Sequence, residues 1–464
     1  MIEPPAAGAA GAAAAGGAGA LEALVTEVPG PRSLALAREL ETSETRGVTY
    51  LARDFPVFWE SARGATVTDV DGNRYLDFTA AFGVAATGHA NPAVARAIAE
   101  QAARMPHGMG DVHPAEVKLR LCDRLARLAP VDDGRVYLAS GGAEAVEFAL
   151  KTAYLATKAP GVLAFGGAYH GLTYGALEVT GIPKFRRPWA KQMRELATFV
   201  PYPDARERGS LERSLRAARK VLRRRSKIGA LIVEPIQGRA GVIFPPEGFL
   251  AELRALATRY DAVMIVDEIY TGFGRLGTWF ACDDARADGT AVRPDILCAG
   301  KALSNGFPIS AAIVTNPIAE AWPRSTGEAL HTSTHLGNPM GCAAALAQIA
   351  EIERRGLLAR ATSAGELVRE RLHDLRSRLA PEIRDVRGRG LLFGVECADG
   401  ALANRVVVEA LARGLVLLQA GPLGQTLALT PPLVATDAQL HRGCDLLDEA
   451  IRAAALAGAS RPGQ

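Results

Sequence analysis

Hydrophobic positions along this chain alternate between short apolar runs and longer stretches with helical spacing, a pattern typical of α/β proteins. The apolar runs predict buried strands at 135–139, 161–165, 230–233, 262–266, 296–299 and 309–314. The helical spacing predicts helices at 92–105, 114–128, 247–260 and 339–355, and a further helix that begins within 140–145 and runs through 157. Strands and helices therefore alternate along the chain, which predicts a large, mostly parallel sheet covered by helices.

The pattern changes near both ends of the chain. After about residue 357 it predicts a helix, strands at 383–386 and 391–396, a helix at 401–413 and a last helix at 437–456. Alternation on both sides of Asp71-Gly72-Asn73 predicts a β-hairpin over 67–78. We expect a disordered tail over 1–20, an N-terminal segment of the small domain over 21–95, a large domain over 96–356, and a C-terminal small α+β domain over 357–464.

Composition narrows the class of protein. The chain has 464 residues, 48% of them hydrophobic and 22% charged, and a formal net charge of +3, so its charge gives no sign of binding nucleic acid or a membrane surface. No apolar run has the ~18 to 20 residues that a bilayer span needs. The six cysteines are scattered and show no C-x-x-C spacing, so we expect no metal site and a reducing cytoplasm. The Ala/Gly-rich start lacks the basic leader of an export signal.

Two charged residues follow apolar runs that predict neighbouring strands. Asp267 comes at the end of the run 262–266, and Lys301 follows the run 296–299 and Gly300. The carboxyl ends of such strands are where ligands bind in open α/β sheets. An amine that forms a Schiff base and an acid that keeps a pyridine nitrogen protonated are the pair that pyridoxal phosphate chemistry needs. Alternatively, the two residues simply pair with other charges at the strand ends.

A glycine turn joins another predicted strand to a helix. Gly141, Gly142 and Ala143 follow the run 135–139 and begin the helix that ends near 157. Free N–H groups and the positive end of the helix dipole favour an anion at such a place. A Gly-Gly turn is by itself a weak signal, because such turns more often serve chain geometry alone.

Two sequence segments resemble the signature of the class III, ornithine/4-aminobutyrate type aminotransferases. They are VDEIYTGFGRLG, which contains Asp267, and PDILCAGKALSNGFP, which contains Lys301. The resemblance covers most of 35–455 and implies a fold type I pyridoxal phosphate-dependent transferase. It implies that Lys301 is the Schiff base lysine, that Asp267 partners the pyridine nitrogen and that Ile269 packs on the ring. SGGAEA resembles the family's phosphate cradle, which implies phosphate contacts at Gly142 and Ala143. Tyr270 stands where several relatives have glutamine.

Other motifs match the same family. Tyr169, before His170-Gly171, matches the aromatic residue that stacks on the pyridine ring, although a core aromatic is the alternative. Thr334 in HTSTHLGNP matches the threonine that reaches the partner subunit's cofactor phosphate, which implies a homodimer with shared active sites. Phe82 and Val84 are candidates for the substrate pocket wall or, equally, ordinary core residues.

The chain departs from the family where relatives bind a substrate carboxylate. Relatives acting on ornithine, acetylornithine or 4-aminobutyrate carry arginine where this chain has Leu172, and a second arginine, paired with a glutamate matched to Glu234, where it has Ala428. A carboxylate without such a partner loses roughly 1.5 to 3 kcal/mol of charged hydrogen bonding. Those substrates are therefore disfavoured, and an amine, an amino sugar or a bulkier amino acid is favoured instead. Arg239 and Arg275 remain as arginines that could meet a carboxylate.

The resemblance implies an aminotransferase acting on an amine or amino acid and a 2-oxo acid. Racemases, epimerases and aminomutases of the same fold are the alternative. Pyridoxal-binding transcription regulators are a further class, but they carry a basic DNA-binding head, which this chain lacks. The basic stretch 213–227 has helical spacing and reads as a solvated helix face rather than as a surface for an anionic partner.

Overall fold

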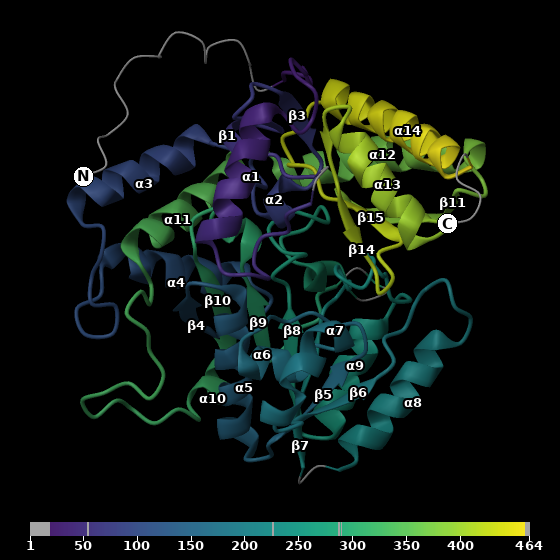
Figure 1. The fold of residues 1–464 in the computed structure, drawn as a ribbon. Helices are drawn as coiled ribbons and strands as arrows, with labels where there is room; N and C mark the ends of the chain where they lie inside the picture. The colour runs from purple at the N-terminus through teal and green to yellow at the C-terminus, as the bar shows by residue number, and fades with distance from the viewer. Residues whose placement is uncertain (1–18, 53–54, 225–226, 286–287, 289, 460–464) are drawn as a thin grey trace.

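The computed structural model describes residues 19–52, 55–224, 227–285, 288 and 290–459. Within these residues the strands form one seven-stranded and two four-stranded sheets. Figure 1 shows the large sheet with its helices in the lower half and the C-terminal helices, coloured yellow-green, in the upper half. The tail expected over 1–20 lies outside the described residues except for its last two positions.

The large sheet carries the two charged residues of interest at neighbouring strand ends. Its order is β4 (Gly134–Ala139), β10 (Ser310–Thr315), β9 (Ile296–Ala299), β8 (Val263–Asp267), β7 (Ile228–Val233), β5 (Gly161–Phe165) and β6 (Ala197–Val200). The pairs β9–β8, β8–β7, β7–β5 and β5–β6 are parallel. Only β10 runs antiparallel to its neighbours β9 and β4. The link from β9 to β10 is too short for the crossover that a parallel pair needs, so β10 turns back.

Alternate residues of these strands face two different helix layers. Val263 and Ile265 of β8 pack in the cluster that includes α5, whereas Met264 and Val266 pack in the cluster that includes α8 and α9. The helices of this part are α3 (Pro92–Arg104), α4 (Glu116–Leu128), α5 (Gly142–Thr157), α6 (Tyr174–Val179), α7 (Pro183–Arg186), α8 (Ser210–Leu222), α9 (Phe249–Arg259), α10 (Asn316–Ala319) and α11 (Pro339–Arg354). Short 3-10 turns are η1 (Arg187–Gln192), η2 (Ala281–Asp284) and η3 (Lys301–Leu303).

The two ends of the chain build the smaller part together. β1 (Trp59–Arg63), β2 (Thr66–Asp69) and β3 (Arg74–Asp77) form an N-terminal sheet, which β13 (Leu415–Val416) joins parallel to β3. β11 (Ile383–Arg389), β12 (Leu392–Cys397), β15 (Thr426–Leu429) and β14 (Leu418–Ala420) form an antiparallel sheet in that order. The helices here are α1 (Pro31–Ser43), α2 (Ala80–Gly83), α12 (Leu357–Arg378), α13 (Gly400–Leu411) and α14 (Asp437–Ala459).

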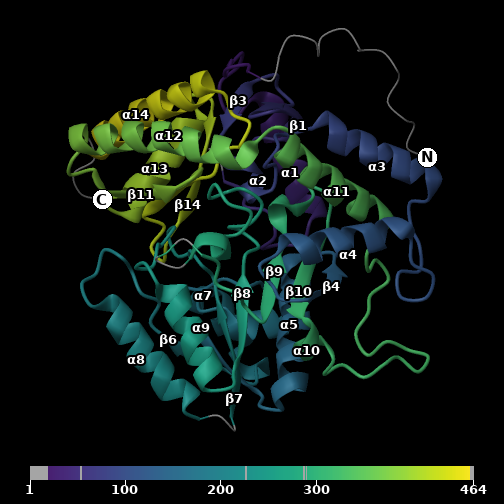
Figure 2. The ribbon, with the colours of Figure 1, turned by 180° about the vertical axis from the view of Figure 1, so that it is seen from behind.

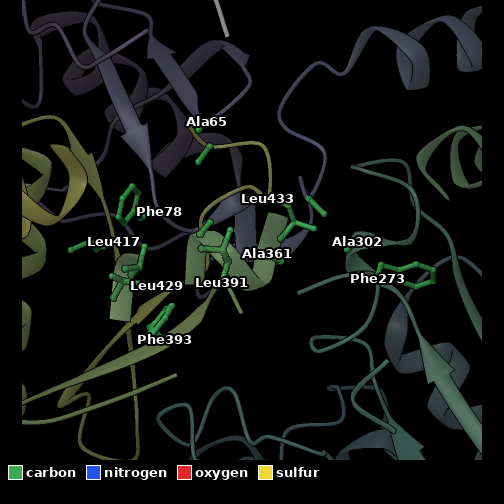
Figure 3. Close-up of a cluster of buried hydrophobic side chains, with 14 of the residues drawn as sticks. Ala65, Phe78, Phe273, Ala302, Ala361, Leu391, Phe393, Leu417, Leu429 and Leu433 are labelled. Atoms are coloured by element: carbon green, nitrogen blue, oxygen red, sulfur yellow. The ribbon is translucent and has the colours of Figure 1, made fainter. Parts of the chain in front are cut away.

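One hydrophobic cluster connects the N-terminal segment, the large sheet and the C-terminal part. Figure 3 labels members from each: Phe78 near the N-terminus, Phe273 and Ala302 beside the large sheet, and Phe393 and Leu429 in the C-terminal sheet. Seen from behind, the C-terminal helices again lie against the N-terminal strands (Figure 2). The cavity described below is therefore bordered by segments far apart in sequence that share one core.

The predicted elements are present with small shifts at their ends. The expected β-hairpin pairs Val67 with Tyr75, and the strand expected over 296–299 has those bounds. The domain division given above stays a prediction, supported by the pairing of β13 with β3. Among the described helices, none combines the length and apolar character that crossing a membrane requires.

Candidate active site

A cavity of about 380 Å³ opens at the carboxyl ends of β8 and β9. Its walls come from the large sheet, the start of α5, the left-handed turn after β3, and strands β14 and β15 of the small part. The lining residues are Thr79, Phe82, Gly142, Ala143, Tyr169, His170, Gly171, Leu172, Glu234, Ile236, Gly238, Arg239, Asp267, Ile269, Tyr270, Lys301, Leu418, Gln419, Ala420, Ala428 and Thr430.

Asp267 ends β8 on the side of the sheet that α5 covers, because it shares the parity of Val263 and Ile265. Its side chain is buried. Oδ1 accepts a hydrogen bond from the backbone N–H of Ile269 at 3.0 Å, and Oδ2 lies 2.7 Å from Nδ1 of His170. A buried carboxylate needs such partners to stay ionised. The position of this negative charge is therefore fixed from two sides.

Lys301 begins the short turn η3, one residue after the end of β9, with a backbone φ of 32°. Its side chain is half-buried, and Nζ lies 4.3 Å from the ring centre of Tyr270. Burial lowers the pKa of the Lys301 amine below its usual value, while Asp267 and Glu234 act in the opposite direction. A lowered pKa leaves more of the amine neutral and therefore nucleophilic.

The start of α5 lies against Ile269. A Cβ on Gly142 would come within 2.8 Å of Cδ1 of Ile269, so glycine allows this close packing. Gly141, the N-cap residue, offers no side-chain cap, and the first-turn N–H groups of Gly142 and Ala143 have no acceptor within the helix. With the helix dipole, these donors favour an anion at this end of the cavity.

Tyr169 forms the aromatic part of the cavity wall. Its backbone N–H donates to Oε2 of Glu234 at 2.9 Å, and its ring contacts Phe185 edge-on at 5.5 Å. Burial raises the pKa of the Glu234 carboxyl to about 7. The guanidinium carbon of Arg239 lies 5.5 Å from the centre of the Tyr169 ring.

A strained turn presents Phe82 to the cavity. Ala80, Ala81, Phe82 and Gly83 all have φ between 45° and 79°, the left-handed region, which costs a non-glycine residue roughly 1 to 2 kcal/mol. Buried Asp77 holds the turn, since its carboxylate accepts from the N–H groups of Thr79 and Ala81 at 2.8 and 3.2 Å. Strained backbone of this kind is concentrated at functional sites.

These groups fit the pyridoxal phosphate that the sequence resemblance implies. The start of α5 offers unpaired N–H groups to a phosphate, and the Asp267 carboxylate suits a protonated ring nitrogen. The amine of Lys301 suits an aldehyde. Ile269 and Tyr169 supply apolar and aromatic surface for a flat ring.

The structure brings together all of the predicted site residues except two. Val84 is half-buried and Thr334 is exposed, and neither residue lines the cavity. Sequence reasoning missed the contact of His170 with Asp267, although His170 stands in a quoted motif. It also missed Asp77, the last residue of β3, which nothing in the sequence separates from the other acidic residues of the predicted hairpin.

The chain is similar to known proteins over most of its length. A family model described as aminotransferase class-III matches residues 50–451. The chain is 36% identical over 447 residues to a 4-aminobutyrate aminotransferase of Mycobacterium leprae, covering 92% of this chain and 97% of that one. It is 31% identical over 450 residues to an alanine/serine racemase of Pyrococcus horikoshii, covering 92% of each. A solved amine transaminase from an uncultivated Pseudomonas species, in its PLP-bound form, matches with a TM-score of 0.79 at 28% identity, covering 88% of this chain and 97% of that one.

Proposed function

The chain belongs to the class III aminotransferase family, and from that membership we propose the roles of its site residues. It is a pyridoxal phosphate-dependent aminotransferase, which moves an amino group between an amine or amino acid and a 2-oxo acid. The observation that carries the proposed roles is the cavity that holds Lys301, Asp267 and the start of α5 together.

We propose that the N–H groups of Gly142 and Ala143 hold the cofactor phosphate, and that Tyr169 and Ile269 flank its ring. When bound, pyridoxal phosphate supplies an aldehyde and a cationic ring that takes up the electrons released at the substrate's α carbon. Asp267, oriented by His170, keeps a positive charge at the ring nitrogen favourable.

Lys301 has two roles in this proposal. Its amine, with a pKa lowered by burial, would hold the cofactor through the aldehyde that the cofactor supplies, and it would be free to act as a base once a substrate amine takes its place. The freed Nζ then takes the proton from the substrate's α carbon as a general base and returns it elsewhere as a general acid. Both roles need the amine of Lys301 to be uncharged, which its burial favours.

A single half-turnover tests these roles. We expect the protein loaded with pyridoxal phosphate to convert an amine to its carbonyl product with a change in cofactor absorbance. Lys301→Ala should lose this reaction almost completely. Asp267→Ala should raise the activation barrier of this reaction by several kcal/mol, and each ~1.4 kcal/mol lowers the rate tenfold. Undiminished turnover by Lys301→Ala would refute the proposed roles.

We also propose that the protein forms a homodimer in which the two subunits share their active sites. We further propose that it is located in the cytoplasm. Thr334 is exposed and does not line the cavity of its own subunit, which supports a role at the partner's site. The six free thiols support a reducing compartment.

Mixed dimers test the shared site. Lys301→Ala and Thr334→Ala subunits, each weak alone, should form one complete site when combined, because one subunit supplies Lys301 and its partner supplies Thr334. Recovered activity on mixing supports the shared site, and a mixture no more active than the sum of its parts contradicts it.

Racemisation is the second candidate activity, and the likeness to the alanine/serine racemase favours it. Such a reaction returns the proton to the same α carbon. Incubation of an L-amino acid in deuterium oxide separates the two activities. Deuterated D-amino acid without oxo acid indicates racemisation, and oxo acid with an aminated cofactor indicates transfer.

A further inference from the structure

The cavity holds an arginine at a place that the family motifs do not account for. The two positions that carry carboxylate-binding arginines in relatives are Leu172 and Ala428, and both line the cavity as apolar walls. Among the described lining residues, Arg239 is the one arginine. We propose, on the basis of the aminotransferase function above, that the guanidinium of Arg239 binds the carboxylate of an amino acid substrate.

The backbone of Arg239 is held firmly. It lies in a tight loop closed by two backbone hydrogen bonds between Gln237 and Ile243, at 3.0 and 3.1 Å. The C-terminal part forms two hydrogen bonds to the same loop. Gly421 N–H donates to the carbonyl of Arg239 at 2.9 Å, and Arg387 Nε donates to the carbonyl of Val242 at 2.8 Å. The loop therefore presents its side chain to the cavity from a fixed base.

The guanidinium of Arg239 is not neutralised within the described part of the chain. Its contacts there are the ring faces of Tyr169 and Phe185, at 5.5 and 5.8 Å from the ring centres. The nearby carboxyl of Glu234 accepts from the N–H of Tyr169 instead. A guanidinium stacked on aromatic rings keeps its N–H edges free for a bidentate carboxylate. The side chain is also exposed, so a substrate can reach it.

Arg275, the other arginine considered from the sequence, cannot do this. Its side chain is 2% exposed and does not line the cavity. Its Nη1 donates to the carbonyls of Leu391 and Pro431 at 3.0 and 2.6 Å. Arg275 therefore connects the large sheet region to the C-terminal part, and Arg239 remains as the carboxylate receptor.

Matched pairs of amines test the proposal. L-norleucine is compared with pentylamine, which lacks its carboxylate, and 4-aminobutyrate is compared with propylamine. We expect Arg239→Gln to lower kcat/KM for the carboxylate-bearing member of at least one pair by about 10- to 100-fold and to leave the plain amine within about twofold. The pair that responds tells whether the α-carboxylate or a distal carboxylate is bound. Arg239→Lys should retain part of the preference for the carboxylate-bearing member. Lysine keeps the positive charge but lacks the planar guanidinium that binds both carboxylate oxygens.

Arg187→Gln is the control for loss of one positive charge. Arg187 is exposed in η1, next to the segment with Phe185, and does not line the cavity. We expect this variant to keep the parent's preference in both pairs. Equal loss for carboxylates and plain amines in Arg239→Gln, or a weaker affinity for pyridoxal phosphate as its main effect, would overturn the proposal.

Direct binding separates this proposal from the proposed function. Calorimetry on the holoenzyme should find hexanoate bound more tightly than hexanamide, and Arg239→Gln should remove that difference. If no amine is converted but this difference is present and lost in Arg239→Gln, the aminotransferase roles are wrong and the carboxylate site stands. If amines are converted and hexanoate binds the variant as tightly as the parent, the carboxylate site is wrong and the function stands.

Discussion

Nδ1 of His170 lies 2.7 Å from Oδ2 of Asp267, and both side chains are buried. An ionised carboxylate only accepts hydrogen bonds, so Nδ1 carries the proton in this pair. Nε2 of His170 is buried without a hydrogen-bond partner among the described residues. The imidazole therefore serves to orient Asp267 rather than to connect it to a longer network.

Removal of this partner should slow the reaction without unfolding the protein. We predict that His170→Ala lowers the rate of the half-turnover by about 10- to 100-fold, since a hydrogen bond to a charged group contributes ~1.5 to 3 kcal/mol. His170→Asn should recover part of the rate, because its amide N–H can replace Nδ1–H. Stopped-flow absorbance measures both. Equal rates in the alanine and asparagine variants would contradict an orienting role.

The contact of Gly142 with Ile269 gives a test of the cofactor cradle. Gly142→Ala should weaken pyridoxal phosphate binding by ~1 to 3 kcal/mol, because the new methyl group pushes Ile269 into the cavity. Ile269→Val, which lacks Cδ1, should relieve this loss in the double variant. Gly141→Ala is the matched control, since a Cβ there meets nothing within 4 Å. Equal affinities for the two alanine variants would show that Gly142 does not border the cofactor.

In the left-handed turn, unlike in a helix, replacing alanine with glycine should stabilise the fold. Ala81→Gly should stabilise the fold by about 0.5 to 1 kcal/mol, because φ of Ala81 is 49° and glycine adopts this region without strain. Ala156→Gly in α5, another half-buried alanine, should destabilise it by a similar amount. Urea unfolding measures both. Destabilisation by Ala81→Gly would mean that the turn is not strained in solution.

The buried carboxyl of Glu234 should make the stability of the folded protein depend on pH. Burial raises the pKa of its carboxyl from the usual 4.5 to about 7, so between these values the unfolded chain loses the proton and the folded one keeps it. The folded state binds more protons there, and stability falls as pH rises through this window, by ~3 kcal/mol in all. Glu234→Gln should match the parent in stability below this window and exceed it above pH 7. A difference between parent and variant that does not change with pH would contradict the raised pKa.

The sheet around Asp267 and Lys301 can be predicted from the sequence because its strands there are short, apolar and buried on both faces. Runs such as 296–299 have one plausible structure, and the glycine turn before α5 follows from chain geometry. The strands β13 and β14 have two and three residues, and their apolar pattern is too short to separate from a loop. Pairing with distant strands, not local preference, makes them strands.

The missed parts of the site depend on contacts between distant segments. Ala-Ala-Phe-Gly at 80–83 has no signal for a left-handed turn, which exists because buried Asp77 accepts from the N–H groups of Thr79 and Ala81. A lone histidine such as His170 is equally compatible with the core until the fold brings it to Asp267. Arg239 and Arg275 are equivalent in sequence, and only packing separates the buried one from the one in the cavity.

The most direct test of the account is the site of covalent attachment. The holoenzyme is treated with borohydride, digested and mapped by mass spectrometry. We predict that the reduced cofactor mass is found on Lys301 and that Lys301→Ala carries none. A label on another lysine, or no label in protein that has bound the cofactor, would contradict the central role of Lys301.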